Sequence, residues 1–201
     1  MEGGGNRVEQ LWSSASARIA AHGIDVHRRT LPPDIPAEFD GLSIVVNPVH
    51  DFEPLCWYLV HSFGSIAGWC LDLDGVKRMF HDLRDAKARK GDDPEGLEHA
   101  IERFRTFEEL ASCYSVWLLG NLGHEWAVRP FTVFFRADLE AMTIFHREGR
   151  APVWRTFLPN FTRDVERGAR AAEPFTPVEI PPFQPARFER QQVKQETGSA
   201  G

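Results

Sequence analysis

One long apolar stretch near the middle of the chain constrains its fold most. The segment PLCWYLVHSFGSIAGWCLD, residues 54–72, carries apolar side chains on nearly every side of a helix. Such a helix has to be covered all round, either by protein or by lipid. Its apolar run, Leu55 to Leu71, is 17 residues long and is interrupted by serine, glycine and His61. Because that is marginal for a membrane span, we expect a central, buried helix and no membrane association.

The segments around this stretch predict more helices and two short strands. Apolar residues recur at helical spacing over 6–23, 74–90 and 94–123, and also over 138–148, while 131–135 is compatible with a strand. Residues 24–28 alternate briefly, and β-branched residues fill 44–46. The prolines between these two segments predict an extended loop. The expected fold class is therefore α+β, with a small sheet packed on several helices.

The composition changes at Glu173, which divides the chain into a domain over 1–172 and a tail over 173–201. The tail contains five prolines and three phenylalanines and cannot form a regular helix. We expect Phe175, Ile180 and Phe183 to lie back on the domain or to bind a partner. The polar run beyond Arg187 is predicted to be disordered.

Charge and cysteine content narrow the functional classes. Asp and Glu outnumber Lys and Arg by 29 to 23, and no basic stripe is visible, so nucleic-acid binding is not expected. The three cysteines, Cys56, Cys70 and Cys113, form a sparse, odd set that is typical of reduced thiols. The N-terminal segment lacks the pattern of a secretory signal. These features predict a cytoplasmic protein.

The central helix carries half of a zinc-peptidase motif. In a helical HExxH motif, two histidines four residues apart bind one zinc ion, and the glutamate acts as the general base. Here His61 stands at the first position, Ser62 at the position of the base and Ser65 at that of the second ligand. A serine hydroxyl is a poor zinc ligand and cannot act as a base near neutral pH. The motif is therefore degenerate.

The order of these segments resembles that of the ImmA/IrrE family of zinc metallopeptidase-like proteins. The resemblance covers about residues 8–120. It rests on Gly23-Ile24-Asp25-Val26, Leu31-Pro32, Gly41 to Asn47, Tyr58 to Ser65, and Leu110 to Leu119. It implies a zincin-like fold in which a glutamate on a second helix is the third zinc ligand. Aligning Ala111 with the alanine of the family pattern places Leu110 at that ligand position, with Glu109 about 100° away around the helix.

The resemblance implies a pseudo-peptidase that retains His61 alone. Members of the family cleave or control repressor proteins, often near bacterial mobile elements or phages. We therefore expect a non-catalytic, regulatory protein that acts through protein contacts and needs no cofactor. One alternative is a divergent metal-dependent hydrolase in which His61 binds zinc together with His50, Glu109 or His124. A second alternative is a structural or accessory protein whose tail binds a partner.

Each candidate residue also has a purely structural interpretation. His61 is expected to be a neutral core histidine, hydrogen-bonded to Ser65 or to a backbone carbonyl. Glu108 and Glu109 are expected to form a solvated helix edge, and His124 a helix end or loop. Asp72 and Asp74 are interpreted as a helix-end turn and N-cap. Three aromatic residues are expected to fill the former cleft: Trp57, Trp69 and Trp117.

Overall fold

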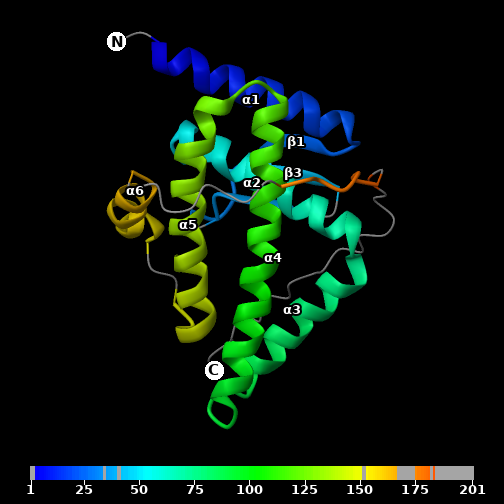
Figure 1. The fold of residues 1–201 in the computed structure, drawn as a ribbon, viewed down its shortest axis with the longest axis vertical. Helices are drawn as coiled ribbons and strands as arrows, with labels where there is room; N and C mark the ends of the chain where they lie inside the picture. The colour runs from blue at the N-terminus through cyan, green and yellow to red at the C-terminus, as the bar shows by residue number, and fades with distance from the viewer. Residues whose placement is uncertain are drawn as a thin grey trace.

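The described residues form six α-helices and a small three-stranded sheet in the computed structural model (Figure 1). It describes residues 3–33, 35–39, 42–150, 153–166, 175–181 and 183. The elements are α1 (Gly3–Ala21), β1 (Asp25–Arg28), β2 (Ala37–Phe39), β3 (Ser43–Val46), α2 (Phe52–Leu71), α3 (Leu73–Ala88), α4 (Pro94–Asn121), α5 (Glu125–Glu148), the short 3₁₀ helix η1 (Trp154–Phe157) and α6 (Leu158–Glu166). The predicted α+β class is confirmed.

The central position of α2 follows from its composition. It packs most extensively on α4 and also contacts α1, α3, α5 and the strands β2 and β3. Residues on every side of α2 are buried, as the apolar sequence predicts. The polar side chains on this helix are consequently enclosed by neighbouring elements.

The sheet has the order β1-β3-β2. β1 runs parallel to β3, with Val26 opposite Ile44, and β2 runs antiparallel to β3, with Phe39 opposite Ile44. All four residues of β3 are buried. In Figure 1, α1 and the sheet lie at one end of the molecule, and α3 with the start of α4 extends to the other. The sequence did not predict β2, which is three residues long and follows a run of prolines.

Helix ends agree with the local sequence. Asp72 is the N-cap of α3, and its Oδ1 accepts a hydrogen bond from the Gly75 N–H at 2.9 Å. Asp93 caps α4 in the same way through the Gly96 N–H, also at 2.9 Å, and Pro94 occupies the first turn. The predicted helix-end role of Asp72 is confirmed.

The strand interpretation of residues 131–135 is wrong. They belong to α5, a single helix from Glu125 to Glu148. Phe131, Phe134 and Phe135 are all buried, because the spacing of three and four places them on the face of α5 that meets the core. The aromatic and β-branched composition of this segment is compatible with a strand, but packing of its helical face against the core favours the helix.

The described part of the tail packs against the domain. Phe175 contacts the ring of Tyr114, with centroids 4.9 Å apart, and Phe183 is buried edge-on against Phe39. Ile180 also packs on the core. The predicted return of this segment is confirmed. The domain boundary at 172–173 and the polar run beyond Arg187 lie outside the described residues.

No helix within the described segments is long and apolar enough to cross a membrane. The longest apolar one, α2, is a core helix.

Candidate functional site

A cavity of about 860 Å³ opens between α2, α4, α5 and the loops beside the sheet. Its polar lining comes from separate elements, whereas much of its wall is apolar. The polar and charged lining residues are His50, Asp51, Tyr58, His61, Ser62, Glu108, Asp138 and Arg155. The apolar ones are Pro33, Pro36, Ala37, Val49, Pro54, Ala141, Met142, Phe145 and Val153. Its volume lies in the range of small-molecule and peptide-binding sites.

Four polar side chains meet beside this cavity. His61 Nε2 on α2 lies 3.0 Å from Glu108 Oε2 on α4. The phenol of Tyr58, one turn before His61, donates a hydrogen bond to Asp138 Oδ1 on α5 at 3.2 Å. Glu108 is 94% buried, since only 6% of its surface is exposed. The cluster therefore joins the three core helices through two side-chain pairs.

A close crossing of α2 and α4 positions His61 and Glu108. A Cβ atom on Gly64 would collide with the backbone carbonyl of Ala111, so α2 approaches α4 closely there because residue 64 is glycine. Ser115 strengthens the crossing by donating a hydrogen bond to the Val60 carbonyl at 3.0 Å. His61 and Glu108 each lie three residues, about one turn, before the contact residue of their helix. Their side chains meet beside the crossing, with Nε2 of His61 3.0 Å from Oε2 of Glu108.

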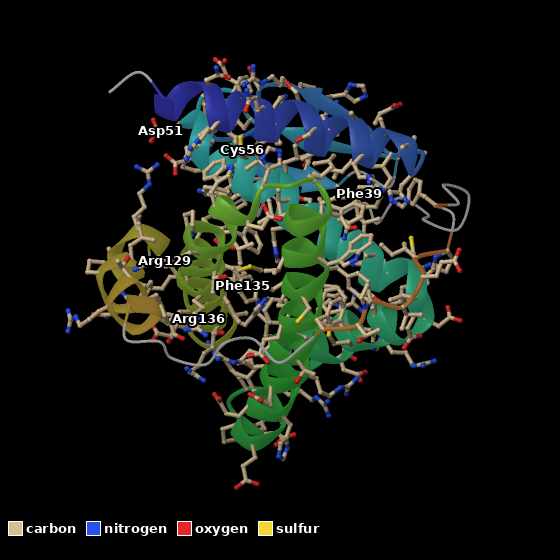
Figure 2. All side chains as sticks on the ribbon, turned by 45° about the horizontal axis from the view of Figure 1, so that its top comes forward. Phe39, Asp51, Cys56, Arg129, Phe135 and Arg136 are labelled. Carbon is tan, nitrogen blue, oxygen red and sulfur yellow. The ribbon has the colours of Figure 1, made fainter. Side chains whose placement is uncertain are left out.

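Phe135 forms an aromatic wall of the cluster. Its ring centroid lies 5.6 Å from that of His61. Figure 2 shows Phe135 between α5 and α4, toward the interior, whereas Asp51 lies at the edge of the molecule. The imidazole is therefore held between a carboxylate and an aromatic ring.

Charges within the cluster shift its protonation equilibria. Burial alone lowers the pKa of His61, but the Glu108 carboxylate and the charge of Asp138 outweigh it, and the pKa lies above its ordinary value. Burial raises the pKa of Asp138 to about 6, although His61 and the Tyr58 hydroxyl oppose this shift. Burial and Asp138 together raise the pKa of Tyr58. The site thus favours a charged His61 and a weakly acidic Asp138.

Several polar atoms at the cavity are enclosed without an aligned hydrogen bond. They are His50 Nε2, His61 Nδ1 and Glu108 Oε2. Of these three atoms, Glu108 Oε2 does have a charged partner, since it lies 3.0 Å from Nε2 of His61. Enclosed polar atoms in this condition are costly unless a ligand or water satisfies them.

The loop that carries His50 is held by a buried asparagine. Asn47 is fully buried, and its side-chain amide donates to the carbonyls of Leu31, Pro32 and Ile35 at 3.1 Å each. The backbone N–H of His50 donates to the Asn47 carbonyl at 3.2 Å. Asn47 thereby ties the proline loop to the end of β3 and fixes the rim of the cavity.

The structure corrects the expected roles of residues 108–110. Glu108 is buried and faces His61, so it is not part of a solvated edge. Leu110 is 42% exposed and does not line the cavity, whereas Glu109 lines a different cavity together with Cys113 and Trp117. The residue beside His61 is therefore Glu108, whereas Leu110, which the resemblance places at the third-ligand position, faces away from it.

The expected environment of His61 is also corrected. Its side chain contacts Glu108, whose carboxylate favours the charged imidazole and raises the pKa of His61 above its ordinary value. Ser65 donates a hydrogen bond to the backbone carbonyl of His61 at 3.3 Å, so it satisfies its own helix and not the imidazole. Ser62 lines the cavity.

His124 has the helix-end role expected for it and lies outside this cavity. It occupies the N-cap position of α5. Its Nδ1 accepts a hydrogen bond from the Trp126 indole at 3.3 Å, and its Nε2 lies 2.7 Å from Ser14 Oγ. Because an acceptor Nδ1 leaves the proton on Nε2, His124 donates to Ser14 and connects α5 to α1.

The three tryptophans do not fill the cavity. Trp57 packs edge-on against Trp126 and Phe131, and Trp69 stacks on Phe80. Trp117 lines the same separate cavity as Glu109. None of the three lines the cavity beside His61. The expectation that they occupy the former cleft is wrong, because they point to other faces of their helices.

Sequence reasoning missed Tyr58 and Asp138. Asp138 continues the apolar spacing of α5, which runs through Phe131, Phe134, Phe135 and Ala141. An acidic residue at such a position is a detectable signal of a buried polar site. Tyr58 had no comparable signal, since a tyrosine suits any core helix.

The side chains present do not fit a catalytic zinc centre. Among the described residues, no three His, Cys, Asp or Glu side chains are grouped so that they could hold a metal ion. Catalytic zinc sites use three protein ligands and an open position. Ser62 and Ser65 lack the required base and ligand chemistry, so the cluster offers one imidazole and one carboxylate in contact.

No protein-family model, curated protein or solved structure matches the chain. The functional argument therefore depends on the geometry of the site.

Proposed function

We propose that the chain is a non-catalytic protein of the ImmA/IrrE type that regulates a protein partner by binding it at the cavity between α2, α4 and α5. The observation that carries this proposal is the direct contact of His61 with Glu108, with serines at positions 62 and 65. Two groups suited to a zinc site are present, but the second histidine and the general base are not.

The openness of the cavity and the polar atoms in its lining support a binding role. The cavity is open and is lined by ring nitrogens of His50 and His61 that are enclosed without a hydrogen-bond partner. Such atoms are retained at a cost to stability, and a bound partner that pairs with them recovers that cost. The apolar wall supplies the remaining contact area.

Metal analysis tests the non-catalytic part of the proposal. The protein is purified without chelator and its zinc content is measured by mass spectrometry, alongside zinc-dependent cleavage of unfolded protein substrates. We expect well below one zinc per chain and no cleavage. Near-stoichiometric zinc and cleavage that both vanish in His61→Ala would contradict the proposal.

Site-specific photo-cross-linking tests the binding part. A photo-reactive phenylalanine analogue is placed at Val49, which is 62% exposed on the rim, or at Leu110, which is 42% exposed on another face. In cells of the source organism, we expect a discrete protein adduct from position 49 and none from position 110. Equal adducts at both positions, or none from position 49, would contradict a partner at this cavity.

One observation favours a second candidate, a metal-dependent hydrolase with ligands outside the usual motif. His50 and His61 line the same cavity, and each has an enclosed ring nitrogen without a hydrogen-bond partner. Glu109 and His124, the other predicted ligands, line other parts of the molecule. Zinc binding that depends equally on His50 and His61 would favour this candidate over the first.

A further inference from the structure

Acidic groups outnumber basic groups in the lining of the cavity. Its lining contains three carboxylates, Asp51, Glu108 and Asp138, against Arg155 and the raised-pKa His61. Arg155 pairs with Asp51 at 2.7 Å, and His61 pairs with Glu108 at 3.0 Å. Asp138 has the Tyr58 phenol as its hydrogen-bond partner, and the positive charge that acts on it is that of His61, which is already paired with Glu108. Two buried carboxylates, Glu108 and Asp138, therefore share the single positive charge of His61.

The cavity also provides an acceptor and an apolar channel. Glu108 is 94% buried, and its carboxylate has further lone pairs that can accept a donor besides His61. On α5, Ala141 and Met142 line the wall one turn beyond Asp138, and Phe145 continues it one turn further. Prolines line the opposite loops. A ligand whose hydrogen-bond donors lie at the end of an aliphatic chain matches this arrangement, because the donors would reach the carboxylates while the chain contacts the apolar wall.

We propose that the cavity binds a guanidinium or primary ammonium group on an aliphatic stem, with Asp138 as its counter-ion and Glu108 as a second acceptor. This chemistry is that of an arginine or lysine side chain, so the proposal rests on the proposed function and names how a protein partner is recognised. An anionic ligand is disfavoured, because both cationic groups of the lining are already paired. The volume exceeds one side chain and leaves room for the flanking residues of a peptide.

Binding of a cation should depend on pH. The groups facing Asp138 are Tyr58 and His61 from α2 and Glu108 from α4, and His50, Asp51 and Arg155 share the cavity. A bound cation favours the ionised form of Asp138, so affinity should be high above pH 6 and fall below it. Protonation of His61 acts in the same direction, since it adds a competing positive charge.

Calorimetric titration of the full chain with capped peptides tests the proposal. The probes are acetyl-Ala-Arg-Ala-amide, the same peptide with citrulline, which is a neutral isostere of arginine, and free agmatine. We expect the arginine peptide to bind at least about tenfold more tightly than the citrulline peptide at pH 7.5. Agmatine that binds as tightly as the arginine peptide would identify a free amine as the source of the cation.

Two α5 variants provide the matched comparison. Asp138→Asn retains a hydrogen-bond partner for Tyr58 and should reduce binding of the arginine peptide to the level of the citrulline peptide. Glu140→Gln changes an acidic residue two positions away, which lines the other cavity and contacts Arg105, and should leave binding unchanged. Circular dichroism and thermal unfolding confirm that both variants fold.

The outcomes separate this proposal from the proposed function. Equal binding of arginine and citrulline peptides, binding retained in Asp138→Asn, or no binding of any probe would overturn the cation site. A partner cross-linked at position 49 would then still support the proposed function. Conversely, tight agmatine binding without any cross-linked protein would support the cation site and contradict the protein partner.

Discussion

At the residue scale, the contact between His61 and Glu108 is the main determinant of the site's electrostatics. The carboxylate offsets the desolvation of the imidazole and raises its pKa above the ordinary value. A histidine with a raised folded-state pKa contributes stability below its unfolded pKa of about 6.5, and this stability is lost as pH rises through the folded value. The contact is therefore strongest in mildly acidic solution.

Glu108→Gln should lower the pKa of His61, because the carboxylate that favours the imidazolium is removed. Unfolding free energy should fall by about 1–3 kcal/mol below pH 6.5, and by less at higher pH. Histidine proton resonances followed by NMR, together with urea unfolding at several pH values, measure both effects. Glu109→Gln, on another face of α4, is the control and should change neither. An unaltered His61 pKa in Glu108→Gln would contradict the assigned ion pair.

The pKa of His146 is shifted in the opposite direction to that of His61. Burial lowers its pKa to about 4, assisted by Lys87, and its ring packs edge-on against Phe104 with centroids 4.7 Å apart. Both ring nitrogens are enclosed without hydrogen-bond partners. Because the unfolded chain takes up this proton near pH 6.5, stability is constant above that pH and decreases as pH falls toward 4.

His146→Leu should therefore remove part of the acid destabilisation. After allowance for the partial exposure of the ring, the expected gain at pH 4.5 relative to pH 7.5 is on the order of 1 kcal/mol. Urea unfolding at the two pH values measures it. His99→Leu, at an exposed position of α4, should show no such difference between pH values. Equal pH dependence in wild type and His146→Leu would contradict this assignment.

At the element scale, the crossing of α2 and α4 determines where the site lies. Residue 64 has to be glycine for the two helices to approach closely, and Ser115 joins them by a hydrogen bond. His61 and Glu108 meet only because the crossing sets the rotation of each helix. Local sequence does not encode this rotation, which explains why α2 could be predicted from its apolar run whereas the inward-facing glutamate could not.

The same distinction between local sequence signals and long-range contacts holds for the other elements. The periodicity of α1, α3 and α4 and the β-branched residues of β3 are local signals, and the corresponding elements were predicted. The strand β2 is too short to carry a pattern, and it forms because β3 offers a free edge. The polar pairs of the site depend on long-range contacts. For example, Tyr58 and Asp138 are 80 residues apart.

Gly64→Ala should destabilise the protein by about 1–3 kcal/mol, because the added methyl group collides with the Ala111 carbonyl and the Ser115 hydroxyl. Gly120→Ala is the matched control, since residue 120 is exposed on α4 and a methyl group there meets open space. That change should stabilise the helix by about 0.5–1 kcal/mol. Chemical denaturation measures both. A neutral effect at Gly64 would mean that the helices separate at little cost.

Ser65→His should introduce zinc binding. Residues 61 and 65 are four apart and share a helix face, and Glu108 already faces His61, so one substitution supplies the missing third ligand. We expect zinc affinity at least about tenfold higher than in wild type by competition with a chelating dye. The gain should disappear when Glu108→Gln is added. No gain would show that the spacing of α2 and α4 is not that of a zinc-binding frame.

At the scale of the whole molecule, the returning tail links elements that are far apart in the sequence. Tyr114 on α4 contacts the Phe175 ring, and its hydroxyl accepts a hydrogen bond from the Val178 N–H at 3.3 Å. Phe183 packs edge-on against Phe39 of β2, the edge strand that the local sequence did not predict. The tail thus supports both the long helix that carries Glu108 and the edge of the sheet.

Phe183→Ala should lower the unfolding free energy by about 2–3 kcal/mol, since a buried ring is lost from the contact with Phe39. Val178→Ala, at a side chain that is 63% exposed, is the matched control and should change it by less than about 0.5 kcal/mol. Thermal and urea unfolding give the stability, and limited proteolysis reports local opening. If the tail is part of the folded unit, Phe183→Ala accelerates cleavage between residues 175 and 183 and weakens the whole domain in one transition. Early cleavage of that segment in the wild type, with no loss of stability in Phe183→Ala, would instead show that the domain folds without it.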